Sequence, residues 1–340
     1  MTARAAVILG CSGPALTPGE RALYRRVRPW GFVLFGRNVE TPGQLAELTA
    51  ALRETVDDPR APVLVDQEGG RVQRLKPPHW PAYPPARIYG SLEGGLARRA
   101  EIAALGGRLM AHDLAAVGIS VDCLPVLDVP RPGAHEVIGD RAFGETADEV
   151  ATLGRAVAEG LLAGGVLPVI KHMPGHGLAA TDSHEGLPVV DAALETLEAV
   201  DFAPFRRLAD MPMAMSAHVV YTAIDPANPA TTSETVIDRV IRGAIGFDGL
   251  LMTDDLSMRA LEGDFTGRAE RALAAGCDVV LHGDGDLGEM AAVAAGCRPL
   301  AGAALRRAEA ALDRLGAPGP LDPALARARF DAALAGRWAA

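Results

Sequence analysis

Eight short apolar runs recur along this chain, and stretches with helical spacing separate them. The runs are continuously apolar, which is typical of parallel strands that are buried on both faces. They cover residues 5–9, 31–35, 62–65, 119–124, 167–170, 213–216, 250–253 and 277–281. Helical patterns lie at residues 41–55, 96–117, 148–163, 194–209, 233–242, 266–275 and 323–334. This alternation predicts a parallel sheet with helices packed against it.

The number of runs narrows the architecture further. Eight strands that alternate with helices predict a (β/α)₈ TIM barrel of the α/β class, and 340 residues suit one such domain. A doubly wound open sheet is the main alternative, but its glycine-rich first turn is poorly matched by residues 10–13. We therefore predict a single barrel domain over 1–340, with a C-terminal helical extension over 317–340.

Composition limits the classes of partner. The net charge of -10 argues against nucleic acid or an anionic membrane as the main partner, although a local basic pocket remains compatible with it. No apolar run approaches the roughly 18 residues of a membrane span, and the run at 5–9 suits a first strand better than a signal segment. The four cysteines are widely separated, so we expect reduced thiols and a cytoplasmic protein.

Polar residues gather where the predicted strands end, and in a barrel this is the functional face. The run at 167–170 continues directly into the loop 171–184, which holds three histidines and whose Pro174, Gly175 and Gly177 exclude a regular helix. A ring of carboxylate, cationic and imidazole groups at one mouth suits a substrate with many hydroxyl groups. The strand ends carry Asp66, Arg74, Asp122, Asp128, Arg141, Lys171, His172, His218, Asp254, Asp255 and His282.

Three of these segments resemble the signatures of family 3 glycoside hydrolases. They are residues 171–177 followed by 181–184, residues 66–74 and residues 253–258, and they occur in the family's order. Within the family the chain is similar to the single-domain bacterial β-N-acetylglucosaminidases of cell-wall recycling, and the resemblance spans nearly the whole sequence. Two departures are Met173, where phenylalanine is common, and the segment 186–188, which differs from the usual polar residues.

The resemblance implies a retaining glycosidase, which needs a nucleophile at the anomeric carbon and a second group that first donates and then accepts a proton. It assigns Asp254 as the nucleophile and His184 as the proton donor and acceptor, with Asp182 orienting that histidine. Residues two apart in an extended segment face the same side, so Asp182 is suitably placed for that role. A histidine titrates near neutrality and serves both proton steps.

The same resemblance predicts the substrate and the residues that hold it. We expect Asp255 to point away from the nucleophile as a structural acceptor, and His176 to shape its loop. The implied substrate is a muropeptide fragment with a non-reducing N-acetylglucosamine on an anhydro-muramic sugar, and no metal or cofactor is implied. The residues assigned to sugar binding are Asp66, Arg74, Arg141, Lys171 and His172.

Three other interpretations remain for a site of this composition. A metal hydrolase would use the histidines of the 171–184 loop with Asp182, although Pro174 and Gly175 keep His172 and His176 from sharing a helix face. A sugar-binding barrel without catalytic activity is the second interpretation. A β-N-acetylglucosaminide phosphorylase on the same scaffold is the third, because a histidine repels an incoming phosphate less than a carboxylate does.

Overall fold

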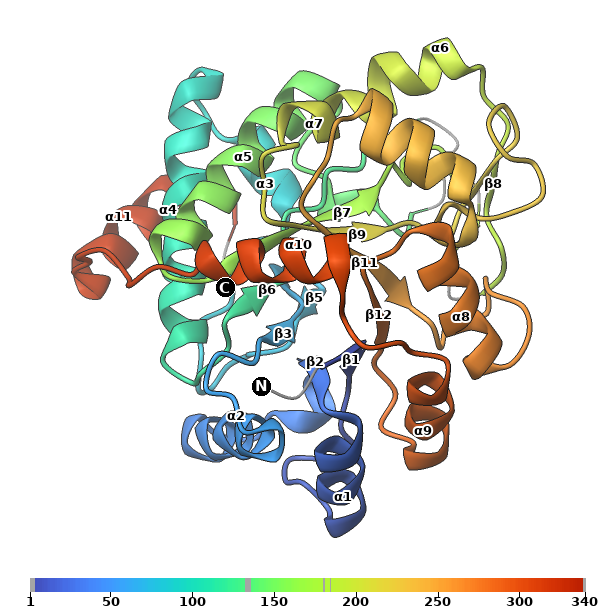
Figure 1. The fold of residues 1–340 in the computed structure, drawn as a ribbon. Helices are drawn as coiled ribbons and strands as arrows, with labels where there is room; N and C mark the ends of the chain where they lie inside the picture. The colour runs from blue at the N-terminus through green and yellow to red at the C-terminus, as the bar shows by residue number, and fades with distance from the viewer. Residues whose placement is uncertain (1–3, 132–135, 180, 184, 339–340) are drawn as a thin grey trace.

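The computed structural model describes residues 4–131, 136–179, 181–183 and 185–338, and a closed barrel of parallel strands lies at its centre (Figure 1). The strands follow one another around the barrel in the order β1-β12-β11-β9-β7-β6-β3-β2. They are β1 Ala5–Leu9, β2 Pro29–Leu34, β3 Val63–Val65, β6 Val121–Asp122, β7 Leu167–Met173, β9 Met213–Ser216, β11 Leu250–Asp255 and β12 Val279–His282. Each predicted run overlaps one of these strands, which confirms the TIM barrel. The doubly wound alternative is wrong because β1 pairs with β2 and closes the sheet.

Two small sheets extend the barrel's loops. The hairpin of β4 (Gln67–Gly69) and β5 (Val72–Gln73) follows β3 almost directly, so it projects from the end of that strand. The second sheet pairs β8 (Val189–Val190) with β10 (Val220–Tyr221), which ties together the loops after β7 and β9. Both sheets therefore stand on the loops at the C-terminal ends of barrel strands.

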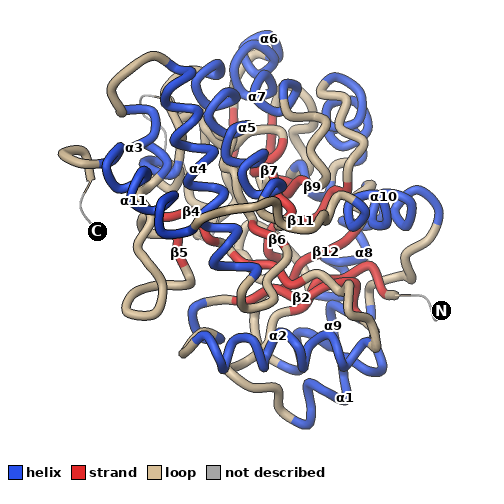
Figure 2. Tube along the Cα trace, turned by 90° about the vertical axis from the view of Figure 1, so that its left-hand side faces the viewer, coloured by secondary structure: helices blue, strands red, loops and turns tan. Residues whose placement is uncertain are grey.

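Helices lie outside the strands in both views of the molecule (Figures 1 and 2). Among the described residues, none of them combines the length and the apolar character needed to cross a membrane. The α-helices are α1 Pro18–Val27, α2 Pro42–Val56, α3 Ala86–Ser91, α4 Leu96–Ala115, α5 Ala147–Ala163, α6 Leu194–Thr196, α7 Phe202–Arg207, α8 Phe265–Ala275, α9 Leu287–Ala295, α10 Gly302–Asp313 and α11 Pro323–Leu334. Short 3₁₀ segments are η1 Gly36–Asn38, η2 Gly139–Arg141 and η4 Ala230–Thr232, and π-helical segments are η3 Leu197–Asp201 and η5 Val236–Ala244.

The helical predictions hold, with two local differences. The predicted helix at 194–209 contains the π-helical segment η3 between α6 and α7, and the one at 233–242 is π-helical over η5. No helix was predicted at the positions of α1, α3, α9 or α10. A signal for α1 was present, because Thr17 and Glu20 form a capping box in which each side chain accepts the other's backbone N–H.

Small residues allow the outer helices to approach one another closely, which suits a chain with only 4% aromatic residues. A Cβ atom on Gly107 of α4 would lie 2.5 Å from the carbonyl oxygen of Val157 on α5. A Cβ on Gly160 of α5 would lie 2.3 Å from the carbonyl oxygen of Ala104. The two backbones are therefore in contact at both positions, and a side chain there would force the helices apart.

Helix α10 lies across the end of the barrel at which the strands begin (Figure 1). Its Arg307 pairs with Asp278, just before β12, at 3.1 Å and with Asp248, just before β11, at 2.7 Å. Arg242 binds the other carboxylate oxygen of Asp278 at 2.8 Å. These pairs fix α10 over the N-terminal strand ends, so the polar residues identified in the sequence lie at the opposite mouth.

The C-terminal helix α11 has the bounds that the sequence predicts, and it packs on the outer layer. The ring of Phe330 is fully buried, with its centroid 6.2 Å from those of both Tyr83 and Tyr89. Arg327 stacks over the Tyr83 ring at 4.6 Å and donates a 2.6 Å hydrogen bond to its hydroxyl. We propose that α11 unfolds together with the barrel as part of one domain.

Substitutions on two faces of α11 test this proposal. Phe330→Ala should lower the free energy of unfolding by about 3–5 kcal/mol, because it empties a buried aromatic site. Leu325→Ala is the matched control on the same helix, where a side chain that is 69% exposed should contribute about 0.5 kcal/mol or less. Denaturant unfolding measures both values, and equal, small effects would mean that α11 is a separable appendage.

Candidate active site in the barrel mouth

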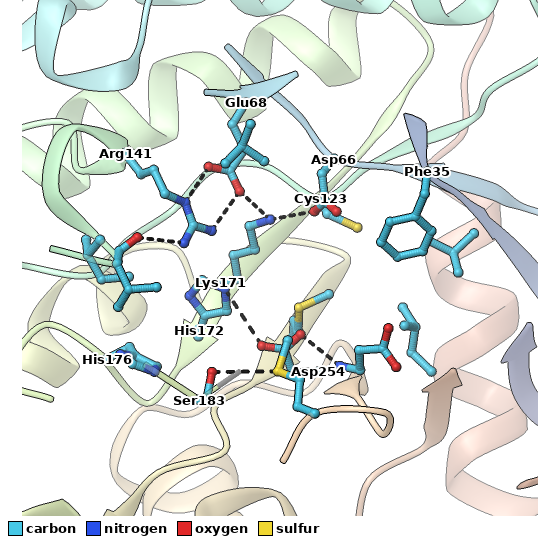
Figure 3. A pocket seen from close by; sticks show the side chains of 18 of the residues that line it. Phe35, Asp66, Glu68, Cys123, Arg141, Lys171, His172, His176, Ser183 and Asp254 are labelled. Carbon is cyan, nitrogen blue, oxygen red and sulfur yellow. Dashed lines mark hydrogen bonds and ion pairs between the residues drawn. The ribbon is translucent and has the colours of Figure 1, made fainter. Parts of the chain in front are cut away.

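A pocket at the C-terminal ends of the strands brings together most of the residues singled out in the sequence (Figure 3). Asp182 is half-buried in the loop after β7, beside Ser183, which lines the pocket. His184 lies outside the described residues. Of the predicted site residues, those that line the pocket are Asp66, Arg74, Arg141, Lys171, His172 and Asp254.

One side of this pocket is a continuous network of ion pairs centred on Lys171 (Figure 3). The Lys171 ammonium is buried, and it lies 2.8 Å from Asp66 Oδ1 and 2.6 Å from Glu68 Oε1. Arg74 Nη2 approaches the other oxygen of Asp66 at 3.2 Å. Arg141 grips Glu68 with two parallel bonds, of 2.8 Å from Nε and 2.9 Å from Nη2. Three cations and two carboxylates therefore form one connected cluster, the Lys171 network.

The Lys171 network keeps its members ionised at neutral pH. Burial opposes ionisation of Asp66, but Lys171 and Arg74 hold the pKa of its carboxyl well below the usual range. Burial likewise opposes ionisation of Glu68, yet the nearby Arg141 and Lys171 lower its pKa to about 2. The two carboxylates in turn raise the pKa of Lys171, against the effect of its own burial. Each carboxylate oxygen keeps a further lone pair, so Asp66 can still accept hydrogen bonds from hydroxyl groups.

Glu68 is a site residue that the sequence analysis did not select. It lies two residues after Asp66 on an extended segment, and such residues face the same side. That spacing, within a segment already assigned to the site, was the available signal. Glu68 is only 3% exposed, and without it Arg141 would lose its bidentate partner and Lys171 one of two counter-ions.

The opposite side of the pocket holds a histidine and a carboxylate. His172 Nδ1 lies 2.7 Å from Asp128 Oδ2, and its other ring nitrogen faces Asp254 Oδ2 at 3.9 Å. The Asp128 carboxylate also accepts the backbone N–H groups of His172 and His176, at 3.2 and 2.7 Å. Asp128, which the sequence only placed at a strand end, therefore fixes the orientation of the His172 ring.

Asp254 stands at the end of β11 with one carboxylate oxygen held and the other turned to the pocket. Its Oδ1 accepts the backbone N–H of Asp255 at 2.8 Å. The Asp255 carboxylate points to the backbone instead, where it accepts N–H groups from Ser257 at 2.9 Å and from Gly283 at 3.2 Å. The prediction that Asp255 is a structural acceptor is confirmed.

Three further histidines, His176, His218 and His282, lie at or near the barrel mouth and have different surroundings. His176 is 4% exposed and lines the pocket, and burial, the largest effect, lowers the pKa of its ring. His218 is fully buried, with its ring nitrogens 2.8 Å from the Thr231 hydroxyl and 3.0 Å from the Asp255 carbonyl oxygen. His282 packs edge-on against Phe265 at 5.1 Å.

The loop after β7 approaches its neighbours too closely for ordinary side chains. A Cβ on Gly177 would lie 1.9 Å from the carbonyl oxygen of Val129, and Gly175 adopts a φ of +141° beside Asp201. The Tyr221 hydroxyl donates to the Gly175 carbonyl at 2.5 Å. These contacts fix the direction in which the loop leaves His172.

The metal-hydrolase interpretation requires several ligand side chains to converge on one point. Across the part of the chain that the structure describes, no group of three or more histidine, cysteine or acidic side chains is placed to hold one. His184 lies outside that part of the chain, so its side chain does not enter this comparison.

Removing the charge of Glu68 should change how stability depends on pH. Because folding lowers its pKa from 4.5 to about 2, ionised Glu68 stabilises the fold above pH 4.5, and this contribution is lost as the pH falls toward 2. The difference in free energy of unfolding between wild type and Glu68→Gln should be on the order of 3 kcal/mol at neutral pH and shrink below pH 4.5. Denaturant unfolding at several pH values measures it, with exposed Glu234→Gln as the control. A difference that stays constant across this range would contradict the assignment.

Comparison with known proteins agrees with this geometry. Residues 29–306 match the glycosyl hydrolase family 3 N-terminal domain. The chain is similar to the β-hexosaminidase of Alkalilimnicola ehrlichii, at 41% identity over 81% of this chain and 79% of that protein. The β-hexosaminidase of Thioalkalivibrio sulfidiphilus is 42% identical over the same shares of the two chains.

Solved structures of similar fold come from the same family. NagZ from Neisseria gonorrhoeae, in complex with N-trifluoroacetyl-D-glucosamine, superposes with a TM-score of 0.84 at 32% identity, over 98% of this chain and 97% of that one. A family 3 β-N-acetylglucosaminidase from Paenibacillus gives a TM-score of 0.80 at 31% identity, with this chain spanning 63% of its length. The chain belongs to glycosyl hydrolase family 3, and within that family to the β-hexosaminidases.

Proposed function

We propose that this protein is a retaining exo-β-N-acetylglucosaminidase in which Asp254 forms a covalent bond to the sugar. The observation that carries the proposal is the carboxylate of Asp254, with one oxygen held by a backbone N–H and the other facing a pocket with a fixed network of charges on its far side. A nucleophile must attack one carbon atom in one orientation. Because the bond to Oδ1 restrains the whole carboxylate, the free oxygen needs little further ordering before it attacks.

The reaction takes place in two steps. In the first, Asp254 attacks the anomeric carbon while the bond to the leaving oxygen breaks, and His184 donates a proton to that oxygen. In the second, His184 takes a proton from water, and the water displaces Asp254 from the anomeric carbon. The two inversions return the released sugar in its original β configuration.

The loop after β7 supplies the proton donor in this proposal. Ser183, which separates Asp182 from His184 in sequence, is 5% exposed and lines the pocket. The chain that carries both proposed residues therefore reaches the mouth. Asp182 orients the His184 ring and raises its basicity, as carboxylates do for catalytic imidazoles.

The Lys171 network holds the sugar in this proposal. Asp66 accepts hydrogen bonds from hydroxyl groups, Arg74, Arg141 and Lys171 donate to them, and His172 donates or accepts beside Asp254. Because the five charged groups of the network brace one another, they need not rearrange when the substrate arrives. The network acts as a rigid socket for one sugar ring.

The proposed substrate is a peptidoglycan fragment that carries a non-reducing N-acetylglucosamine on an anhydro-muramic sugar, hydrolysed in the cytoplasm. Its support is the similarity to NagZ, whose solved complex contains an N-acylated glucosamine. The comparisons favour neither phosphorolysis nor loss of catalysis, because the sequence relatives are named β-hexosaminidases.

The effect of removing the His184 side chain on kcat/KM should depend on whether the leaving group needs a proton. His184→Ala should be severely impaired on a natural disaccharide but far less impaired in cleaving a dinitrophenyl glycoside, whose leaving group departs without a proton. The gap in kcat/KM between the two substrates should be about 10²–10⁴-fold, the usual value of general acid–base catalysis. Steady-state kinetics with both substrates measures it.

Hydrolysis of the glycosyl-enzyme, the second step of the reaction, provides another test of His184→Ala. Breakdown of the glycosyl-enzyme should become rate-limiting in His184→Ala, and azide should accelerate it because the anion needs no proton removed. Asp182→Asn should show the same pattern in a milder form. Equal impairment on both substrates, without any effect of azide, would remove His184 from the acid–base role.

A further inference from the structure

One guanidinium group on helix α8 holds both ends of the loop that follows the nucleophile. Arg268 Nη1 donates to the carbonyl oxygen of Leu256 at 2.6 Å and to that of Met258 at 3.3 Å. Its Nε donates to the carbonyl oxygen of Gly263 at 3.0 Å. One side chain thus joins the beginning and the end of the segment 256–263, which we term the nucleophile loop.

The position of Arg268 is itself fixed. Its guanidinium stacks over the ring of Phe265, one turn earlier on α8, at 5.2 Å. Phe265 in turn packs against the buried His282 at the end of β12. The guanidinium that donates the three hydrogen bonds is therefore held in place, through Phe265, against strand β12.

The nucleophile loop also supports the loop that carries the proposed proton donor. Ala260 donates its backbone N–H to the carbonyl oxygen of Ser183 at 3.2 Å. The hydroxyl of the same serine lies 3.6 Å from the Met258 sulfur, so Ser183 is seated on the nucleophile loop from two directions. Ser183 is 5% exposed, which shows that the seat is closely packed.

We propose that Arg268 is a positioning residue: by holding the nucleophile loop, it fixes Ser183 relative to Asp254, and Ser183 directly precedes the proposed proton donor in the chain. Asp254 belongs to β11 and is held by the N–H of Asp255, before the nucleophile loop begins, whereas Ser183 rests on the middle of that loop. Loss of the guanidinium frees the loop and with it Ser183, while Asp254 keeps its own bond. This inference rests on the proposed role of His184, the residue after Ser183.

The arrangement requires an arginine and not merely a positive charge. The guanidinium spreads its donors across a plane, and here Nε and Nη1 reach carbonyl groups on both arms of the loop. A lysine ammonium concentrates its donors at one point and cannot span both arms. Arg268→Lys should therefore retain the charge and lose much of the effect.

Arg268→Ala should lower kcat/KM on a natural disaccharide by up to about 10²-fold, the usual cost of a misplaced catalytic group. On the dinitrophenyl glycoside, which needs no proton, kcat/KM should change by less than about threefold, well below the acid–base contribution. Arg271→Ala is the matched control, because Arg271 lies on the same helix and donates to the backbone carbonyl oxygen of Glu262, which follows Ala260, and contacts only one end of the loop. It should affect both substrates little. Equal losses for Arg268→Ala on both substrates would overturn the proposal and assign Arg268 to the fold or to Asp254.

A double-mutant cycle separates this inference from the function on which it rests. In a His184→Ala background, Arg268→Ala should cause no further loss on the disaccharide, because the group that it positions is gone. A full additional loss would overturn the inference even if His184→Ala alone behaves as an acid–base variant. If His184→Ala alone shows no dependence on the leaving group, the proposed function fails first. Arg268→Lys with wild-type kinetics on the disaccharide would also contradict the proposal.

Discussion

The ammonium group of Lys171 is the charge on which the arrangement of the site depends. It is buried in the barrel mouth, where an unpaired charge would cost far more than a folded protein can offset. Asp66 and Glu68 compensate it, and each of these carboxylates is braced by an arginine on its outer side. Strand β7, the end of β3 and the hairpin that follows it must therefore keep their register. The same ion pairs therefore hold both the local fold and the proposed sugar site.

The two sides of the pocket hold groups with different proposed roles. The Lys171 network holds charges that do not change during a reaction, because their pKa values are displaced far from neutrality. The other side, around Asp254 and the loop after β7, holds the groups that form and break bonds in our proposal. In this proposal the position of the reacting groups depends on the contacts that hold Ser183 against the nucleophile loop.

Local patterns were enough to predict the barrel and the ring of polar strand ends. Each strand overlaps a continuous apolar run, so no tertiary information was needed to find it, and α11 was predicted with its observed bounds. The links between the ring's members were not predictable in this way. Asp128 and His172 are 44 residues apart, and Arg268 meets the nucleophile loop only because α8 folds back over it. Asp66 was predicted as a site residue and Glu68 was not, because spacing does not say which carboxylates will neutralise a buried lysine.

In the proposed mechanism, Asp254 becomes covalently attached to the sugar. A slow fluorinated N-acetylglucosaminyl donor should trap that intermediate, and mass spectrometry of the digested protein should locate one sugar on the peptide that contains Asp254. The account predicts this adduct in the wild type and its absence in Asp254→Asn, with Asp255→Asn as the neighbouring control that still accumulates label. An adduct on a different carboxylate, or steady turnover of the donor without any adduct, would contradict it.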